Sequence, residues 1–538
     1  MIKRLLKVST NTITSAAVIV ASFSILSRGV GFIRDRILAG AFGASDALDI
    51  YFTAFRVPDL FYQLLVVGAL SASFIPLFTK YYSKKQYDDA WFLTSNLLNI
   101  IAIGFGALSI FGAIFAPALV PLIAPGFTPE KQMAVATLTR VMLISQVFLS
   151  VSMVFGSALQ GARHFLLYSL APIFYNIGII LGAVVLVPLL GLIGLAWGVV
   201  LGGFMHFAIQ GIGVYSLGYK YKPVFNFKSP DVKYTLKHMP PRVLGLAVNQ
   251  VNFLAMTVIA SLLATGSVTM LQFAYNLNFF PIGVFAVSYA IAVFPTLCEQ
   301  AEQEDQDAFV RSFSTTVRQM MLFIAPATVI FILLRAQIVR VVVGAGAFDW
   351  PATILTADTL GWFVVSLFAQ SIVFILVRAF FAKDDTMTPF LGGLIAAAIN
   401  VIAALSLSKI YGVIGLGMAY SISAIVQMVL LWTLLRRKTK TLDERKIAKS
   451  FAILFAAAAF CALATQGMKS VVVRFISLDT FLGVLAQGLI AGSVGFAVFV
   501  SAAFLLKSPE MYEFLRGLKR RFWKRVKPEE QIVTNLTS

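Results

Sequence analysis

Long apolar runs, repeated along almost the whole chain, constrain the fold more than any other feature of the sequence. An α-helix needs about 20 apolar residues to cross a bilayer. Runs of this length lie near residues 14–38, 59–79, 93–123, 134–160, 164–188, 192–217, 240–264, 270–297, 313–343, 358–381, 387–408, 411–435, 447–473 and 481–506. We therefore expect an all-α polytopic membrane protein with about fourteen transmembrane helices.

The composition excludes the common soluble classes. Only 12% of the 538 residues are charged, whereas soluble domains carry about 25%. The net charge of +19 does not indicate a nucleic-acid partner, because the lysines and arginines gather in loops between apolar runs rather than on one exposed face. Cys298 and Cys461 lie in or beside apolar runs, so no disulfide framework is expected. The first run lacks a small-residue cleavage site and is predicted to be a retained span.

The distribution of basic residues predicts the orientation. Basic residues gather at the N-terminus and in even-numbered loops, at Lys3, Arg4, Lys7, Lys80, Lys84, Lys85, Lys220, Lys222, Lys228, Lys233, Lys237, Arg436, Arg437, Lys438, Lys440, Arg445, Lys446 and Lys449. Cytoplasmic loops carry such an excess, so both termini should be cytoplasmic. Residues 507–527 mix basic and aromatic residues, which is typical of a helix lying on an anionic leaflet; a solubilising tail is the alternative.

An internal repeat predicts the domain organisation. Gly43 to Pro58 and Gly266 to Pro281 have the same spacing, and Leu192 to Leu195 resembles Val413 to Leu416. Six runs separate the copies, which indicates a parallel repeat, and such repeats place substrate sites near their interface. The predicted parts are an N-terminal lobe (1–217), a cytoplasmic loop (218–238), a C-terminal lobe (239–436), two appended helices (437–506) and a basic cytoplasmic tail (507–538).

Charged residues inside the apolar runs are the candidate site residues, because burying a charge in a membrane is costly. Arg28 and Arg34 lie within the first run and are predicted to bind an anion. Asp35 is seven residues from Arg28, so a local ion pair between these two is the alternative. Asp49 and Arg56 flank the start of the second run and could either serve the cavity or pair with each other.

Metal and cofactor chemistry is not indicated. The histidines at positions 164, 206 and 238 are scattered without the spacing of metal ligands. There is also no glycine-rich phosphate loop followed by lysine. We expect no metal and no cofactor, although a coupling cation of unknown identity is compatible with the sequence.

These motifs resemble a known family. The matching residues are Ser27, Arg28, Gly31, Phe32, Arg34, Asp35, Phe42 to Ala44, Asp49, Ala54 to Pro58, Gly68, Ala69, Phe74 to Pro76, Thr388 and Pro389. In this pattern the chain is similar to the MurJ (MviN) lipid II flippases of bacteria. The resemblance implies the fold of the multidrug, oligosaccharidyl-lipid and polysaccharide exporter superfamily, with two lobes around a cationic cavity, alternating access, and a lipid-tail groove on the last two helices.

Carried over residue by residue, the resemblance places Arg28, Arg34, Asp49 and Arg56 in the substrate cavity. The chain also departs from the family pattern. Well-known members carry an Arg and a Glu where this chain has Gln63 and Val67, and an Asp-Arg pair where it has Tyr275 and Asn276. The cavity is therefore expected to be less charged, with Asp35, Gln63 and Asn276 as further substrate-binding candidates.

The leading hypothesis is a lipid II flippase of the bacterial cytoplasmic membrane, with lipid II and membrane lipids as partners and with a monomeric state. An exporter of another lipid-linked oligosaccharide or of an amphiphilic drug is the first alternative. A membrane-bound transferase is the second, but the runs hold no carboxylate cluster suited to metal or acid-base chemistry. We therefore expect a transporter and not an enzyme.

Overall fold

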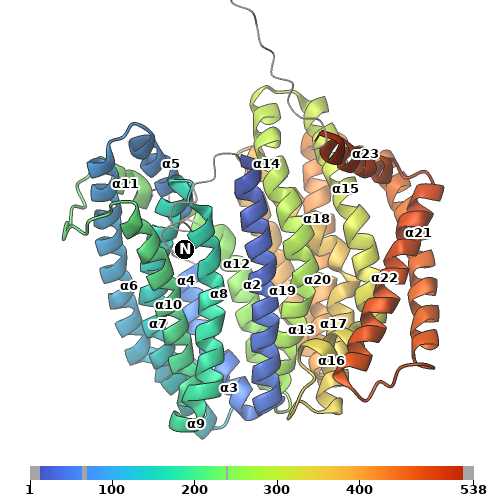
Figure 1. The fold of residues 1–538 in the computed structure, drawn as a ribbon, viewed down its shortest axis with the longest axis horizontal. Coiled ribbons are helices and arrows are strands. Elements are labelled where there is room, and N and C mark those ends of the chain that lie inside the picture. The colour runs from blue at the N-terminus through green and yellow to red at the C-terminus, as the bar shows by residue number, and fades with distance from the viewer. Residues whose placement is uncertain (1–12, 64–69, 238–239, 525–538) are drawn as a thin grey trace, which may run out of the picture. The chain divides into compact units, whose positions relative to one another are not determined.

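The computed structural model describes residues 13–63, 70–237 and 240–524, and the described residues form helices and no strand (Figure 1). Contacts divide the chain into two compact units. Unit 1 contains residues 1–278, 338–363 and 386–427, and unit 2 contains residues 279–337, 364–385 and 428–538. The predicted division at residues 217 and 239 stays a prediction.

Unit 1 holds the helices up to residue 278 and two later segments. Its helices are α2 (Ile13–Phe42), α3 (Asp46–Ala54), α4 (Arg56–Tyr62), α5 (Leu70–Ser83), α6 (Tyr87–Ile123), α7 (Pro129–Gly161), α8 (Phe165–Leu181), the π-helical η2 (Gly182–Leu186), α9 (Val187–Leu190), α10 (Ile193–Ser216), α11 (Pro230–Lys237), α12 (Pro240–Ser261), most of α13 (Ser267–Pro281), α16 (Arg335–Val342) and α17 (Trp350–Val365), then α19 (Met387–Tyr411) and the first part of α20 (Val413–Thr439). Helices α6, α7 and α10 run side by side (Figure 1).

Unit 2 is built around α15. It comprises η3 (Ile282–Ala286), α14 (Val287–Glu302), α15 (Gln306–Leu333), α18 (Leu367–Ala382), the end of α20, α21 (Glu444–Val472), α22 (Phe481–Leu505) and α23 (Pro509–Lys524). Helix α15 contacts α14, α18 and α21, and α21 packs along α22.

The predicted spans agree well with the helices. Ten described helices or continuous helical segments are long and apolar enough to cross a membrane, and the pair α17 and α18, bent by 48°, makes an eleventh if it is one span. These correspond to the third to sixth and the eighth to fourteenth predicted runs. The chain is therefore a multi-pass membrane protein, but the count of fourteen is not confirmed.

The three remaining runs are not among these spans. Helix α2 has 30 residues and carries Arg28, Arg34, Asp35 and Arg36. The second run covers parts of α4 and α5, and residues 64–69 between them lie outside the described residues. In α12, the described part from Gln250 to Ser261 is a shorter apolar helix. These three runs stay predictions.

The sequence repeat is visible in the backbone. Gly43 and Gly266 both have positive φ, at 68° and 87°, and each lies just before the repeated helix. Gly191 and Gly412 form a second matched pair, at 69° and 58°, ahead of α10 and α20. Glycine adopts these left-handed conformations without the steric cost that a Cβ brings. The two copies therefore enter their helices through the same kind of turn.

Glycines also hold α8 and α10 close together. Gly178 and Gly182 face Gly198 and Gly202, and a Cβ on Gly198 would lie 2.5 Å from the Cα of Gly182. Small residues four apart allow membrane helices to approach closely and gain packing contacts. We call these four residues the glycine seam.

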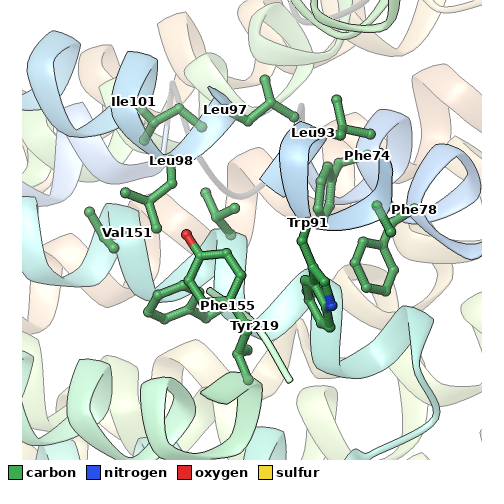
Figure 2. Close-up of a cluster of buried hydrophobic side chains, with 14 of the residues drawn as sticks. Phe74, Phe78, Trp91, Leu93, Leu97, Leu98, Ile101, Val151, Phe155 and Tyr219 are labelled. Carbon is green, nitrogen blue, oxygen red and sulfur yellow. The ribbon is translucent and has the colours of Figure 1, made fainter. Parts of the chain in front are cut away.

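A cluster of buried aromatic and aliphatic side chains fixes the end of unit 1 where α6 begins. Trp91 lies between Phe78 of α5 and Tyr219, with ring centroids 5.3 and 5.5 Å away (Figure 2). Leu93 and Leu97 of α6 extend the same buried face, as expected for residues four apart on a helix. The non-helical segment 219–228, here called the strap, packs against this end through Tyr219.

The basic C-terminal segment is helical in part, as α23, and its first turns are docked within unit 2. Glu510 is buried and forms an ion pair with Arg318 of α15 at 2.5 Å. Gln319 donates to Glu513 at 3.0 Å, and Phe514 meets Phe323 edge to face. The predicted contact of this segment with an anionic leaflet stays a prediction.

Candidate functional site

A chain of hydrogen bonds joins two arginines inside unit 1, and it contains four of the residues singled out from the sequence. It runs from Asn176 through Arg34, Asp35, Asn276 and Gln272 to Arg56. The donors and acceptors come from α2, α4, α8 and α13. We call this set the arginine network.

Arg34 lies at the centre of one half of the network. Its Nε and Nη2 donate to Asp35 Oδ1 at 3.0 and 2.7 Å, and Nη1 donates to Asn176 Oδ1 at 2.9 Å. A guanidinium has five N–H donors, so the bonds made within the described residues leave two for a ligand. The Arg34 side chain as a whole keeps 22% of its surface exposed.

Asp35 connects the two halves and is only 3% exposed. Its second oxygen, Oδ2, accepts from Asn276 Nδ2 at 3.3 Å. Asn276 in turn accepts from Gln272 Nε2 at 2.8 Å. The alternative ion pair of Asp35 with Arg28 is not formed, since Asp35 pairs with Arg34 and residues seven apart on a helix are about 10 Å apart along its axis.

Arg56 is the most confined cation of the network, at 5% exposed. Its Nη2 donates to Gln272 Oε1 at 2.7 Å, and its guanidinium carbon lies 4.5 Å from the centre of the Phe253 ring. Its Nε is buried and has no hydrogen-bond partner among the described residues. Buried polar groups are nearly always bonded, so Arg56 is the residue at which an incoming anion would gain most.

Asp49 is 1% exposed and faces the start of α13, where it does not pair with Arg56. Its carboxylate accepts from the backbone N–H of Gly266 at 2.7 Å and of Thr269 at 2.9 Å, and from Thr269 Oγ1 at 2.7 Å. A carboxylate at this place caps the helix and complements its dipole. The geometry makes Asp49 a positioning residue that ties α3 to the helix carrying Gln272 and Asn276.

The other predicted site residues lie away from these bonds. Arg28 is partly exposed on α2, about 9 Å along the helix axis from Arg34. Gln63 ends α4 and is partly exposed, directly before residues 64–69. Val67 belongs to those residues and lies outside the described part of the chain. Tyr275 packs its ring against Phe253 at 4.4 Å, beside Arg56.

Sequence reasoning missed Asn176 and Gln272. Asn176 is the single amide of its apolar run, whereas Gln272 shares its run with Asn276 and Asn278; amides in membrane helices commonly bond to neighbouring helices. That signal was present but could not indicate which partner each amide meets.

Metal ligands do not gather among the described residues, where no group of three His, Cys, Asp or Glu side chains could hold an ion. His206 is buried and its Nδ1 lies 2.7 Å from Ser152 Oγ, which also donates to Gln210 at 2.9 Å. His238 lies outside the described residues. The expectation of a metal-free site stays an expectation.

Comparison with known proteins finds relatives of this chain by sequence. Residues 38–486 match the family model described as lipid II flippase MurJ. A Burkholderia cenocepacia protein named lipid II flippase MurJ is 27% identical over 436 residues, which cover 79% of this chain and 84% of that protein. A Buchnera aphidicola protein with the name "Probable lipid II flippase MurJ" is 28% identical over 463 residues, covering 85% of this chain and 89% of its own.

Solved structures agree. An inward closed conformation of lipid II flippase MurJ superposes with a TM-score of 0.72 at 25% identity, covering 90% of this chain and 98% of the other. An inward-facing multidrug resistance MATE family transporter of the MOP superfamily gives a TM-score of 0.66 at 12% identity, covering 78% of this chain and 96% of its own. The second likeness concerns the fold alone.

Proposed function

The chain belongs to the lipid II flippase family MurJ, a family of transporters, and on this premise we propose that it moves lipid II from the cytoplasmic to the outer leaflet by alternating access. The single observation that carries the proposal is the arginine network, which holds one buried and one partly buried cation in a multi-pass membrane protein. Lipid II is a diphosphate attached to a polyprenyl chain, so its head is anionic and its tail is apolar. The network meets the first of these requirements.

Arg34 and Arg56 bind the diphosphate in this proposal. Arginine suits the task because its planar fork donates two parallel bonds to phosphate oxygens and stays charged at working pH. Arg34 contributes the donors that its bonds to Asp35 and Asn176 leave over, and Arg56 contributes its unbonded Nε. Arg28 lies on α2 nearer its N-terminus than Arg34, and it makes an earlier contact with the incoming diphosphate.

The amides of Gln272 and Asn276 act as exchangeable partners. They occupy Arg56 and Asp35 through hydrogen bonds of 2.7 and 3.3 Å in which one partner is charged, each worth about 1.5 to 3 kcal/mol net. A diphosphate is itself charged and can accept two parallel bonds from one guanidinium. A diphosphate therefore displaces the single amide oxygen from Arg56, while Asp35 remains paired with Arg34.

The membrane placement follows from the same proposal. Both termini and the strap lie on the cytoplasmic side, because the basic residues gather there. The polyprenyl tail stays in lipid beside α21 and α22, which expose apolar side chains such as Phe455, Leu463 and Leu482. The protein works as a monomer without a cofactor, and a cation gradient or the membrane potential drives the cycle.

The test is lipid II exposure on the outer face of bacterial cells depleted of their own flippase. The wild-type chain, Arg34→Ala, Arg56→Ala and the corresponding lysine variants are supplied in turn. Arg140→Ala is the matched control, because Arg140 of α7 is an exposed arginine in the same unit. Membrane levels of each variant are measured in parallel.

Wild type and Arg140→Ala should restore exposure, while both network alanine variants should fail at normal membrane levels. The lysine variants should be intermediate, because lysine keeps the charge but lacks the fork. Loss of one arginine corresponds to about tenfold to hundredfold weaker binding. Normal transport by both alanine variants would contradict the assigned site, and no restoration by a well-inserted wild type would point to another lipid-linked cargo.

A further inference from the structure

A cavity separate from the arginine network lies where α5, α6 and the strap meet in unit 1. It has a volume of about 450 Å³ and is lined by Tyr82, Tyr87, Asp88, Trp91, Leu217, Gly218, Lys220 and Lys222. Cavities of about 300 to 1,000 Å³ commonly hold small molecules. None of these residues belongs to the arginine network, so the proposed transport function leaves the cavity unexplained.

The cavity is held in shape by buried polar bonds behind it. Asn99 Nδ2 donates to the carbonyl oxygens of Lys222 and Val224 at 3.2 and 2.8 Å. Asn96 donates to the carbonyl of Asn226 and accepts from its N–H, at 2.9 and 2.8 Å. These bonds fasten the strap to α6 through its backbone. The side chains of Lys220 and Lys222 are thus left to face the cavity and solvent.

Flat aromatic rings form one side of the cavity. Tyr82 lies edge to face against Tyr87 at 5.1 Å and against Trp91 at 6.1 Å. Trp91 is itself backed by Phe78 and Tyr219, so this wall is part of the buried cluster (Figure 2). A rigid aromatic wall can stack a planar ligand group, and such stacking on a nucleobase contributes about 1 to 3 kcal/mol.

Ammonium groups form the other side. Lys220 and Lys222 both line the cavity, and Lys222 Nζ is 3.6 Å from Asp88 Oδ1. This pair is weak, because the Asp88 side chain is 99% exposed and solvent screens such contacts. The lining therefore carries a net positive charge and attracts an anion, with Asp88 as an acceptor for hydroxyl or N–H groups.

Exposed apolar side chains reach the cavity on one helix but not on another. On α6 they run from Ile103 to Leu122, well past Trp91, whereas on α10 they continue to Tyr215, two residues before Leu217 in the cavity lining. The phosphate of a soluble ligand and that of a lipid headgroup are therefore both considered, and the test below distinguishes them.

We propose that this cavity binds a water-soluble nucleoside diphosphate, with the base against Tyr82 and Tyr87 and the phosphates at Lys220 and Lys222. The ring wall selects a planar group, which a phosphatidylglycerol headgroup lacks, and the lysines select phosphate. The site lies on the side proposed above to be cytoplasmic, where nucleotides occur. It extends the proposed function and does not depend on it, because binding is measured without transport.

The test is titration calorimetry on the full-length protein in detergent, with UDP and ADP as probes. Pyrophosphate, uridine and vesicles containing phosphatidylglycerol serve as comparison ligands. The variants are the double change Lys220→Ala with Lys222→Ala, and Tyr87→Ala. Lys228→Ala is the matched control, because Lys228 is an exposed strap lysine that does not line the cavity.

At least one nucleoside diphosphate should bind, and pyrophosphate and uridine should each bind about tenfold more weakly. The double lysine variant and Tyr87→Ala should weaken binding by about tenfold or more, while Lys228→Ala should match wild type. No nucleotide binding at millimolar concentration, equal affinity for pyrophosphate, or unchanged affinity in the double variant would overturn the proposal. Binding of vesicles but not of nucleotides would overturn it in favour of a lipid ligand.

Discussion

The cap that Asp49 places on α13 gives the sharpest test of how the arginine network is held. Three hydrogen bonds end on this buried carboxylate, from Gly266 N, Thr269 N and Thr269 Oγ1. Asp49→Ala removes all three and leaves two backbone N–H groups buried without partners. Each orphaned group costs about 1 to 3 kcal/mol, so the free energy of unfolding should fall by about 2 to 6 kcal/mol. Asp49→Asn keeps one acceptor oxygen and should lose about half as much.

The assay is unfolding of the full-length protein by sodium dodecyl sulfate in mixed micelles, followed by tryptophan fluorescence. Asp46→Ala is the control, since Asp46 begins the same helix but is 53% exposed where it pairs with Lys131. Such a surface pair contributes up to about 1 kcal/mol. If Asp49→Ala is no less stable than Asp46→Ala, the capping argument is wrong. Transport by Asp49→Asn should follow its folded fraction, because the carboxylate faces α13.

Three further changes test other parts of the structure. Gly198→Ala should destabilise the glycine seam by about 2 kcal/mol in the same unfolding assay, whereas Gly104→Ala, whose Cβ meets nothing within 4 Å, should be neutral. Asn99→Ala should free the strap and speed hydrogen exchange at the amides of residues 219–228, and unchanged exchange would contradict its anchoring role. Glu510→Ala leaves Arg318 without its partner, at a cost of about 3 kcal/mol, and should make α23 sensitive to limited proteolysis while wild type resists.

The sequence predicted the helices well because the bilayer imposes a length on each apolar run. Ten helices and the bent pair α17 and α18 fall on predicted runs. Where charges or a helix end interrupt the pattern, as in α2 and between α3 and α4, apolar length stops being informative. The contact units divide the chain at residues 278, 337, 363, 385 and 427, which no local pattern indicates.

The candidate site was predicted in its charges but not in its bonds. Arg34, Asp35, Arg56 and Asn276 were singled out, and the structure joins them through Asn176 and Gln272. Spacing offered two ion pairs as alternatives to a role in the cavity, Arg28 with Asp35 and Asp49 with Arg56. Asp35 instead pairs with Arg34 on the same helix, and Asp49 bonds to Gly266 and Thr269 at the start of α13. Contacts between helices depend on how the helices pack and not on the periodicity of each one.

The amide partners of the arginine network bear on the return stroke of the carrier. After a transporter releases its cargo, it must return to its starting conformation without cargo. A guanidinium without a bonding partner in the low-dielectric interior would raise the free-energy barrier of that return step. In this structure Arg34 is paired with Asp35, and Arg56 donates to Gln272. Each guanidinium therefore has a bonding partner within the protein when no cargo is bound. The carrier without cargo can then return to its starting conformation without binding an anion from solution. Its turnover should therefore not depend on which anion the buffer contains.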